Sequence, residues 1–337
     1  MIEYDIFDLG DFILQSRCTL KKGRLAFKTY GKLNSAGDNV IVYPTSFGSS
    51  HVNNEPMIGE DKALDPSKYF IIIPNLLGNG LSSSPSNSPK PQDRSGFPKL
   101  TYYDVVVGQH RLLTEHFGIK RVKLVCGGSM AAQQVFHWGA LYPEMVERIA
   151  PWCGSAKTSV HNFVFLEGIK AALKSDSSWD NGWYGRPPHK GLRAMSRVYA
   201  GWGPSQEFYR DRIYLQNGFA TIEEYISREW ESRFVHVDAN DLLSMISTWQ
   251  NGDISDNHIF QGDIEAALSS IKAKGLLMPS QTDQYFPKED SENEVLFMSN
   301  VELRVIPSKW GHLAGVPGRN PVDTRFIDSA LKELLAY

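Results

Sequence analysis

The chain has 337 residues, of which 42% are hydrophobic and 22% are charged, so it is long and apolar enough to bury a large core. Its 35 Lys and Arg residues nearly balance its 38 Asp and Glu residues, and the net charge of −3 does not favour nucleic acid or an anionic membrane as a partner. No stretch is as long as a transmembrane helix, and the three cysteines are too widely spaced for a zinc site or a disulfide framework. We therefore expect a cytoplasmic protein that binds no metal.

The first part of the chain alternates between strands and helices. Residues 12–16 and 24–31 are predicted to form an antiparallel hairpin with a turn at residues 21–23. Uninterrupted apolar runs then predict buried strands, which are typical of a parallel sheet covered on both faces. These runs span residues 39–44, 69–74, 122–125 and 147–152, and a helix is predicted over residues 103–117. The alternation predicts an α/β fold with a mostly parallel central sheet flanked by helices.

Helical periodicity replaces this pattern in the middle of the chain. Helices are predicted over residues 163–173 and 192–200, after a capping box at 221–224, and from Asp238 to Trp249. A helical block of this size inside an α/β core predicts an inserted lid. The predicted lid spans residues 157–262, and the predicted core comprises residues 1–156 and 263–337. The core then continues with two strands and a closing helix, predicted over residues 276–280, 301–306 and 321–335.

Residues 122–142 have the pattern of a strand, a sharp turn and a helix, with Ser129 at the turn. The turn reads Gly127-Gly-Ser-Met-Ala131, which is close to the G-x-S-x-G nucleophile elbow. In such an elbow, small neighbours let a strained serine stand clear of the backbone. The alternative is an ordinary strand-to-helix turn, because Gly and Ser are both common in turns.

Two later strands each end in a candidate partner for Ser129. Asp283 follows the predicted strand at 276–280, and His312 follows the one at 301–306. The chain order Ser, Asp, His, with each residue just past the carboxyl end of a strand, is that of the α/β-hydrolase triad. In this chemistry His312 removes the proton of Ser129, while Asp283 fixes the tautomer of the imidazole and stabilises its protonated form.

An oxyanion hole requires two backbone amides aimed at the developing negative charge. One candidate is the amide of Met130, which directly follows Ser129 at the start of a helix. The other is expected from the loop at residues 45–48, where Ser46 and Phe47 are both candidates. The alternative for this loop is a turn that binds no ligand.

Several segments together resemble the homoserine O-acetyltransferase family of α/β hydrolases. Besides Gly127-Gly-Ser-Met130 and His312 after Trp-Gly, they are Lys62-Ala-Leu-Asp65, Asn75-Leu-Leu-Gly78 and Val237-Asp-Ala-Asn240. The resemblance covers almost the whole chain, including the helical block. It implies that an acetyl group passes from acetyl-CoA to the serine and then to homoserine. It also implies a homodimer assembled through the lid.

The chain departs from this family where an amino-acid substrate would bind. The family's catalytic His is followed by an Asp that contacts the homoserine ammonium, whereas this chain has Leu313. Arg197 matches the Arg that the family's lid places near the substrate, but Pro204 replaces the accompanying Tyr. The two glycines after Met130 are replaced by alanines. A buried ammonium without a carboxylate partner is strongly unfavourable, so Leu313 disfavours an amino acid as acceptor.

The sequence therefore predicts a serine hydrolase that forms an acyl-enzyme and acts on short-chain carboxylic esters, in the first place acetyl esters. The alternative is an O-acetyltransferase for homoserine or another hydroxyl acceptor, with acetyl-CoA as co-substrate; otherwise no cofactor is expected. The predicted site comprises catalytic Ser129, Asp283 and His312, oxyanion residues Ser46 and Met130, and substrate-binding Phe47, Arg197 and Leu313. A third possibility is a catalytically silent binding protein on the same fold, against which the complete triad argues.

Overall fold

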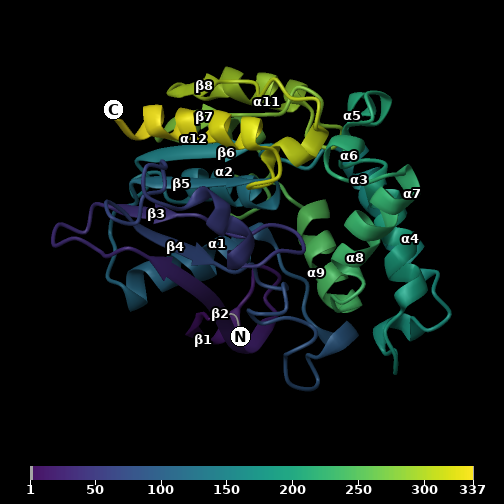
Figure 1. Cartoon of the computed structure of the whole chain (residues 1–337). Helices are drawn as coiled ribbons and strands as arrows, with labels where there is room; N and C mark the ends of the chain where they lie inside the picture. The colour runs from purple at the N-terminus through teal and green to yellow at the C-terminus, as the bar shows by residue number, and fades with distance from the viewer. Residues whose placement is uncertain (1–2, 337) are drawn as a thin grey trace.

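The structure, a computed structural model, describes residues 3–336 and contains an eight-stranded sheet (Figure 1). The strands are β1 Asp5–Ile13, β2 Thr19–Tyr30, β3 Val40–Val42, β4 Phe70–Pro74, β5 Leu124–Gly128, β6 Arg148–Trp152, β7 Lys274–Leu277 and β8 Val301–Leu303. Their order across the sheet is β1-β2-β4-β3-β5-β6-β7-β8, with β1 and β2 antiparallel to their neighbours and β3 to β8 mutually parallel. The predicted mostly parallel sheet is confirmed. Residues 1, 2 and 337 of the predicted core lie outside the described residues.

Both faces of the sheet are covered by helices. The flanking helices are α1 Tyr102–Arg111, α2 Met130–Leu141, α10 Ile264–Ser269, α11 Lys288–Glu294 and α12 Pro321–Ala336. In β3, Val40 and Val42 join the apolar cluster formed with α1 and α2, whereas Ile41 joins the cluster formed with α12. Successive side chains of a strand point to opposite faces, so every residue of this strand is buried. This explains why the parallel strands appear in the sequence as uninterrupted apolar runs.

The N-terminal hairpin differs from the prediction in the position of its turn. Residues 21–23 lie inside β2, and the chain reverses at residues 14–18, where the Leu14 amide donates to the Cys18 carbonyl at 2.8 Å. The residues expected to turn are instead held in the strand by Asp11 of β1. Its carboxylate forms an ion pair with Lys21 at 2.7 Å and accepts a hydrogen bond from the Lys22 amide at 3.2 Å.

A group of helices lies beside the sheet, inserted between β6 and β7 (Figure 1). These inserted helices are α3 Val160–Lys174, α4 His189–Ala200, α5 Gln206–Arg210, α6 Ile213–Gln216, α7 Ile222–Tyr225, α8 Ser232–Phe234 and α9 Ala239–Gln250. The helix starts predicted at Thr221 and Asp238 are present. The Thr221 side chain accepts a hydrogen bond from the Glu224 amide, and the Asp238 side chain accepts from the amides of Asn240 and Asp241. The function of this segment as a lid and its boundaries at 157 and 262 stay predictions. Across residues 3–336, no helix is long and apolar enough to cross a membrane.

Candidate active site

Ser129 occupies the sharp turn between β5 and α2. Its backbone has φ 60° and ψ −130°, a conformation that is strained for a residue with a side chain. The Ser129 amide donates to the carbonyl oxygens of Trp152 and Cys153, at 3.0 and 3.1 Å, which ties the turn to the end of β6. The strand, strained serine and helix together form a nucleophile elbow.

The two glycines before Ser129 are required by their close neighbours. A Cβ atom on Gly127 would lie 2.6 Å from the Cβ of Ala131, in the first turn of α2. A Cβ atom on Gly128 would lie 2.2 Å from Nε1 of Trp152. Both distances are far below van der Waals contact, so any larger residue at either position forces the elbow to move.

His312 and Asp283 are joined by a hydrogen bond next to this elbow. His312 Nδ1 lies 2.6 Å from Asp283 Oδ2, and both side chains are almost completely buried. The other carboxylate oxygen of Asp283 accepts from the amides of Tyr285 and Phe286, each at 3.1 Å. With both its oxygens engaged, the carboxylate holds one orientation and leaves Nε2 of His312 free to face Ser129.

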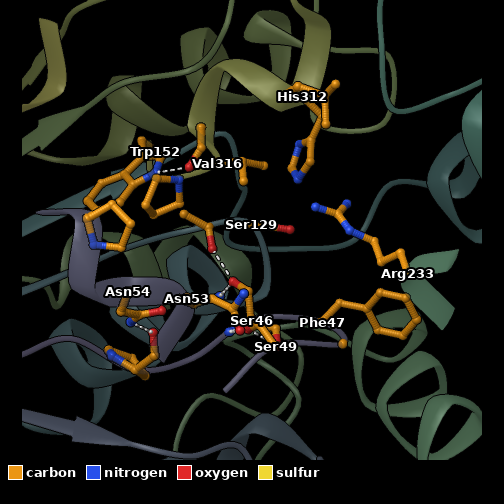
Figure 2. A pocket seen from close by; sticks show the side chains of 18 of the residues that line it. Ser46, Phe47, Ser49, Asn53, Asn54, Ser129, Trp152, Arg233, His312 and Val316 are labelled. Atoms are coloured by element: carbon orange, nitrogen blue, oxygen red, sulfur yellow. Dashed lines mark hydrogen bonds between the residues drawn. The ribbon is translucent and has the colours of Figure 1, made fainter. Parts of the chain in front are cut away.

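The loop that carries His312 is anchored on two sides. The Trp152 indole donates from Nε1 to the Gly315 carbonyl at 2.8 Å (Figure 2), and the His312 amide donates to the Gly203 carbonyl at 2.9 Å. Gly203 belongs to the loop between α4 and α5, so the inserted helices contribute to the position of the imidazole. Within the described chain, no hydrogen bond joins Ser129 Oγ to His312, a contact that commonly tightens only when substrate binds.

Ser129 and His312 line a cavity of about 270 Å³ between the core and the inserted helices. From the core, Phe47, Trp152 and Leu313 form much of its wall. From the inserted helices and the turns joining them, the side chains are Tyr199, Trp230 and Arg233. None of the described residues that line the cavity is Asp or Glu. Among residues 3–336, no three or more His, Cys, Asp or Glu side chains are grouped to hold a metal ion.

The comparison with known proteins agrees with this geometry. Residues 39–316 match the family described as the alpha/beta hydrolase fold. The chain belongs to the α/β-hydrolase fold family. It is 37% identical over 336 residues to the ethyl acetate hydrolase of Pseudomonas veronii, a match covering 99% of this chain and 95% of that protein. Its structure resembles that of an acetylester hydrolase from Corynebacterium glutamicum, with a TM-score of 0.96, 36% identity, and coverage of 99% and 96% of the two chains.

Homoserine O-acetyltransferases are also relatives of this α/β hydrolase. The enzyme of Trichormus variabilis is 31% identical over 316 residues, a match covering 89% of this chain and 86% of that protein. The predicted resemblance to that family is therefore confirmed. The ester hydrolases share a higher identity with this chain than this transferase does.

The predicted oxyanion donor Ser46 requires a correction. Its amide already donates to Oγ of Ser49 at 3.0 Å, so it is not available to a substrate oxygen. The neighbouring Phe47 lines the cavity, and no hydrogen bond to its amide is present within residues 3–336. The Met130 amide lies at the first position of α2, where a helix amide has no acceptor within its own helix. Phe47 and Met130 therefore remain the candidate pair of oxyanion donors.

The predicted substrate contact of Arg197 is wrong, whereas Leu313 and Phe47 do line the cavity. Arg197, on α4, pairs with Glu223 and Glu231, each at 2.5 Å, and it is not among the residues around the cavity. The family resemblance predicts an Arg at this position of the helix. The direction in which the Arg197 side chain points, however, depends on the glutamates that the other inserted segments provide. These partners hold Arg197 on the surface.

Arg233 is a charged residue of the cavity lining that the sequence analysis did not single out. It follows a π-helical turn, Ile226–Glu231, and lies on α8. Figure 2 shows its guanidinium turned toward His312 and Ser129. The inserted segment contains many arginines, and spacing along the chain does not distinguish the one that faces the cavity. The turn that precedes Arg233 packs against α4, a tertiary contact that the sequence pattern does not reveal.

Proposed function

We propose that this α/β hydrolase is a carboxylic ester hydrolase that forms an acyl-enzyme on Ser129. The observation that carries the proposal is the strained elbow serine, which lines one cavity with a His312 imidazole hydrogen-bonded to a buried Asp283. These are the nucleophile, the general base and the group that orients the base. The relatives named ethyl acetate hydrolase and acetylester hydrolase support the same reaction.

The reaction proceeds in two halves. His312 Nε2 takes the proton of Ser129 Oγ as Oγ attacks the ester carbonyl carbon, and the Phe47 and Met130 amides stabilise the oxyanion that forms. The carbon–oxygen bond to the alcohol then breaks, and His312 gives its proton to the departing alcohol. In the second half His312 removes a proton from water as the water oxygen attacks the acyl carbon. The bond from this carbon to Ser129 Oγ then breaks, His312 returns the proton to Oγ, and a carboxylic acid leaves.

The size of the cavity supports a short acyl group. Its volume of about 270 Å³ lies near the lower end of the range of roughly 300–1,000 Å³ that is typical of ligand pockets. Phe47, Trp152 and Leu313 give it bulky apolar walls around Ser129. A small cavity with bulky walls favours a short acyl group such as acetyl.

Transfer to homoserine is the second candidate, since transferases are among the relatives. Homoserine carries an ammonium, and none of the described cavity residues offers a carboxylate to pair with it. The position after His312 is occupied by Leu313, which is 2% exposed. Because an unpaired buried ammonium is strongly disfavoured, water is the better acceptor of the acyl group.

The hydrolytic reaction needs no cofactor. Homodimerisation through residues 157–262 and a cytoplasmic location stay predictions.

The experiment that tests this proposal compares two reactions of the purified protein. Free acetate is followed with ethyl acetate in water, and CoA release is followed with acetyl-CoA in the presence and absence of homoserine. We expect acetate release and no homoserine-dependent CoA release. Ser129→Ala should abolish acetate release and labelling by a fluorophosphonate. Homoserine-dependent CoA release would establish the transferase instead, and wild-type activity of Ser129→Ala would refute the nucleophile.

A further inference from the structure

Arg233 lacks the partner that an arginine in its position normally has. It is half-buried, and within the described residues it forms no ion pair and no hydrogen bond. Its guanidinium lies 5.6 Å from the centre of the Trp230 ring, a contact that orients it without neutralising its charge. The five N–H donors of the guanidinium therefore remain available to another molecule.

The neighbouring arginines show that acidic partners are plentiful in this region. Arg197 pairs with Glu223 and Glu231, and Arg228 pairs with Glu224 at 2.6 Å. Arg319 pairs with Glu229, which precedes Trp230 in the chain. Arg233 differs from these residues in facing the cavity rather than the surface of the inserted helices (Figure 2). Of these arginines, Arg233 is thus the one that lines the cavity and also lacks an acidic partner among the described residues.

The cavity has a single positive charge and no described negative charge in its lining. Apart from His312, Arg233 is the only ionisable residue of basic character among the described lining residues. Surrounding it are Tyr199, Trp230 and Tyr285, whose rings exclude water and strengthen electrostatic interactions. A carboxylate matches a guanidinium through two parallel hydrogen bonds and fits this small space. A half-buried cation with aromatic walls thus favours a carboxylate on the substrate.

The position of Arg233 indicates which half of the ester carries this carboxylate. His312 returns its proton to the departing alcohol, so the alcohol portion lies on the His312 side of Ser129. Figure 2 shows the guanidinium on that side of the cavity, across from Trp152. We propose that Arg233 is a specificity residue that selects acetyl esters whose alcohol portion bears a carboxylate. This inference rests on the proposed hydrolase function.

The test uses two esters that differ only in charge. One is 3-acetoxypropanoate and the other is its amide, 3-acetoxypropanamide, which has nearly the same shape. The ratio of their kcat/KM values is measured with a single enzyme preparation, so that any general loss of activity cancels. For the wild type we expect a ratio of about 10 or more in favour of the carboxylate. In Arg233→Gln the ratio should fall to about 1 or below, because the charge and the planar donor fork are both removed.

Arg228→Gln is the matched control, because Arg228 lies in the same inserted segment but pairs with Glu224 at the surface. Its ratio should equal that of the wild type. A wild-type ratio of one or less, or an Arg233→Gln ratio equal to that of the wild type, overturns the inference. Ethyl acetate is measured beside the two esters. If it is hydrolysed while the ratio is one or less, the proposed function stands and only the assignment of Arg233 fails. If none of the three esters is hydrolysed, both fail.

Discussion

The hydroxyl of Ser46 donates a hydrogen bond to the carbonyl oxygen of Gly128 at 2.5 Å. The same hydroxyl oxygen accepts a hydrogen bond from the Ala131 amide at 3.1 Å. Ser46 therefore connects the loop after β3 to the elbow on both sides of Ser129. Because Phe47 is the next residue, these two bonds fix its amide relative to the nucleophile and to Met130. We therefore predict that Ser46 supports the oxyanion hole through its side chain rather than through its own amide.

Replacing Ser46 by Ala removes both hydrogen bonds to the elbow. We expect the free energy of unfolding to fall by about 1–2 kcal/mol, as for the loss of partly buried hydrogen bonds. We also expect kcat for ethyl acetate to fall roughly tenfold, because the Phe47 amide is no longer held at the right distance from the oxyanion. Urea unfolding and initial rates measure the two effects. Ser50→Ala is the control, since among residues 3–336 that hydroxyl hydrogen-bonds only with Asn53 in its own loop, and this variant should keep kcat near that of the wild type. Equal rates for the two variants would contradict the role of Ser46.

Asp283→Asn tests the orientation of the imidazole. The two backbone amides that bind Asp283 Oδ1 can still bind the amide oxygen of Asn, so the new NH₂ group is directed at His312 Nδ1. Nδ1 must then act as an acceptor, the proton moves to Nε2, and the imidazole no longer accepts the proton of Ser129. We expect kcat to fall roughly 10³–10⁴-fold, with little change in thermal stability.

The control for Asp283→Asn is Asp256→Asn, which changes an exposed aspartate outside the cavity. It should retain the wild-type kcat. A decrease of less than tenfold in Asp283→Asn, with the fold intact by circular dichroism, would show that Asp283 does not set the tautomer of His312.

The parts of the fold that the sequence predicts well are those set by local patterns. Strands β3 and β4 are buried on both faces, so their apolar runs identify them regardless of their neighbours. The elbow is recognisable because Gly127 and Gly128 have no sterically acceptable replacement. Asp283 and His312 could be selected because parallel strands bring their carboxyl ends to one edge of the sheet. The hydrogen bond expected between these two residues is present.

The parts that the sequence does not predict depend on contacts between distant segments. Whether Ser46 or Phe47 offers its amide is decided by the Ser49 hydroxyl, which occupies one of the two. Whether Arg197 or Arg233 reaches the cavity is decided by glutamates on other inserted helices. Hydrophobic periodicity does not describe such polar pairings, because they follow from the tertiary arrangement.

Two glycine-to-alanine substitutions are expected to change the stability of the protein in opposite directions. In Gly128→Ala the new methyl group would meet Trp152 Nε1 at 2.2 Å, so the elbow and the indole cannot both keep their places. We expect a loss of about 1–3 kcal/mol in the free energy of unfolding and a loss of esterase activity. Gly168, in contrast, is an exposed residue inside α3 with nothing within 4 Å of the new atom. Gly168→Ala should stabilise the protein by roughly 0.5–1 kcal/mol. Urea unfolding of both variants checks the signs, and a stabilised, active Gly128→Ala would refute the packing argument.

The buried carboxyl group of Asp241 is expected to make the free energy of unfolding depend on pH. This residue of α9 is 2% exposed, and its carboxylate accepts hydrogen bonds from the amide and hydroxyl of Ser86 in the core, at 2.9 and 2.6 Å. Burial, with a smaller effect from nearby Asp238, raises the pKa of Asp241 to about 7 from an ordinary value of 3.8. Because the folded state binds the proton more tightly, the stabilisation is fully present below about pH 4 and is lost as the pH rises through 7.

Asp241→Asn mimics the protonated carboxyl at every pH. Its free energy of unfolding should therefore rise relative to that of the wild type by roughly 2–3 kcal/mol between pH 5 and pH 8, because only the wild type must bury a charge at the higher pH. Urea unfolding at pH 5, 6, 7 and 8 measures the difference, with the exposed Asp256→Asn variant expected to follow the wild type throughout. Parallel stability curves for Asp241→Asn and the wild type would mean that Asp241 remains ionised in the folded protein across this range. The contact between α9 and Ser86 would then be an ordinary charged hydrogen bond.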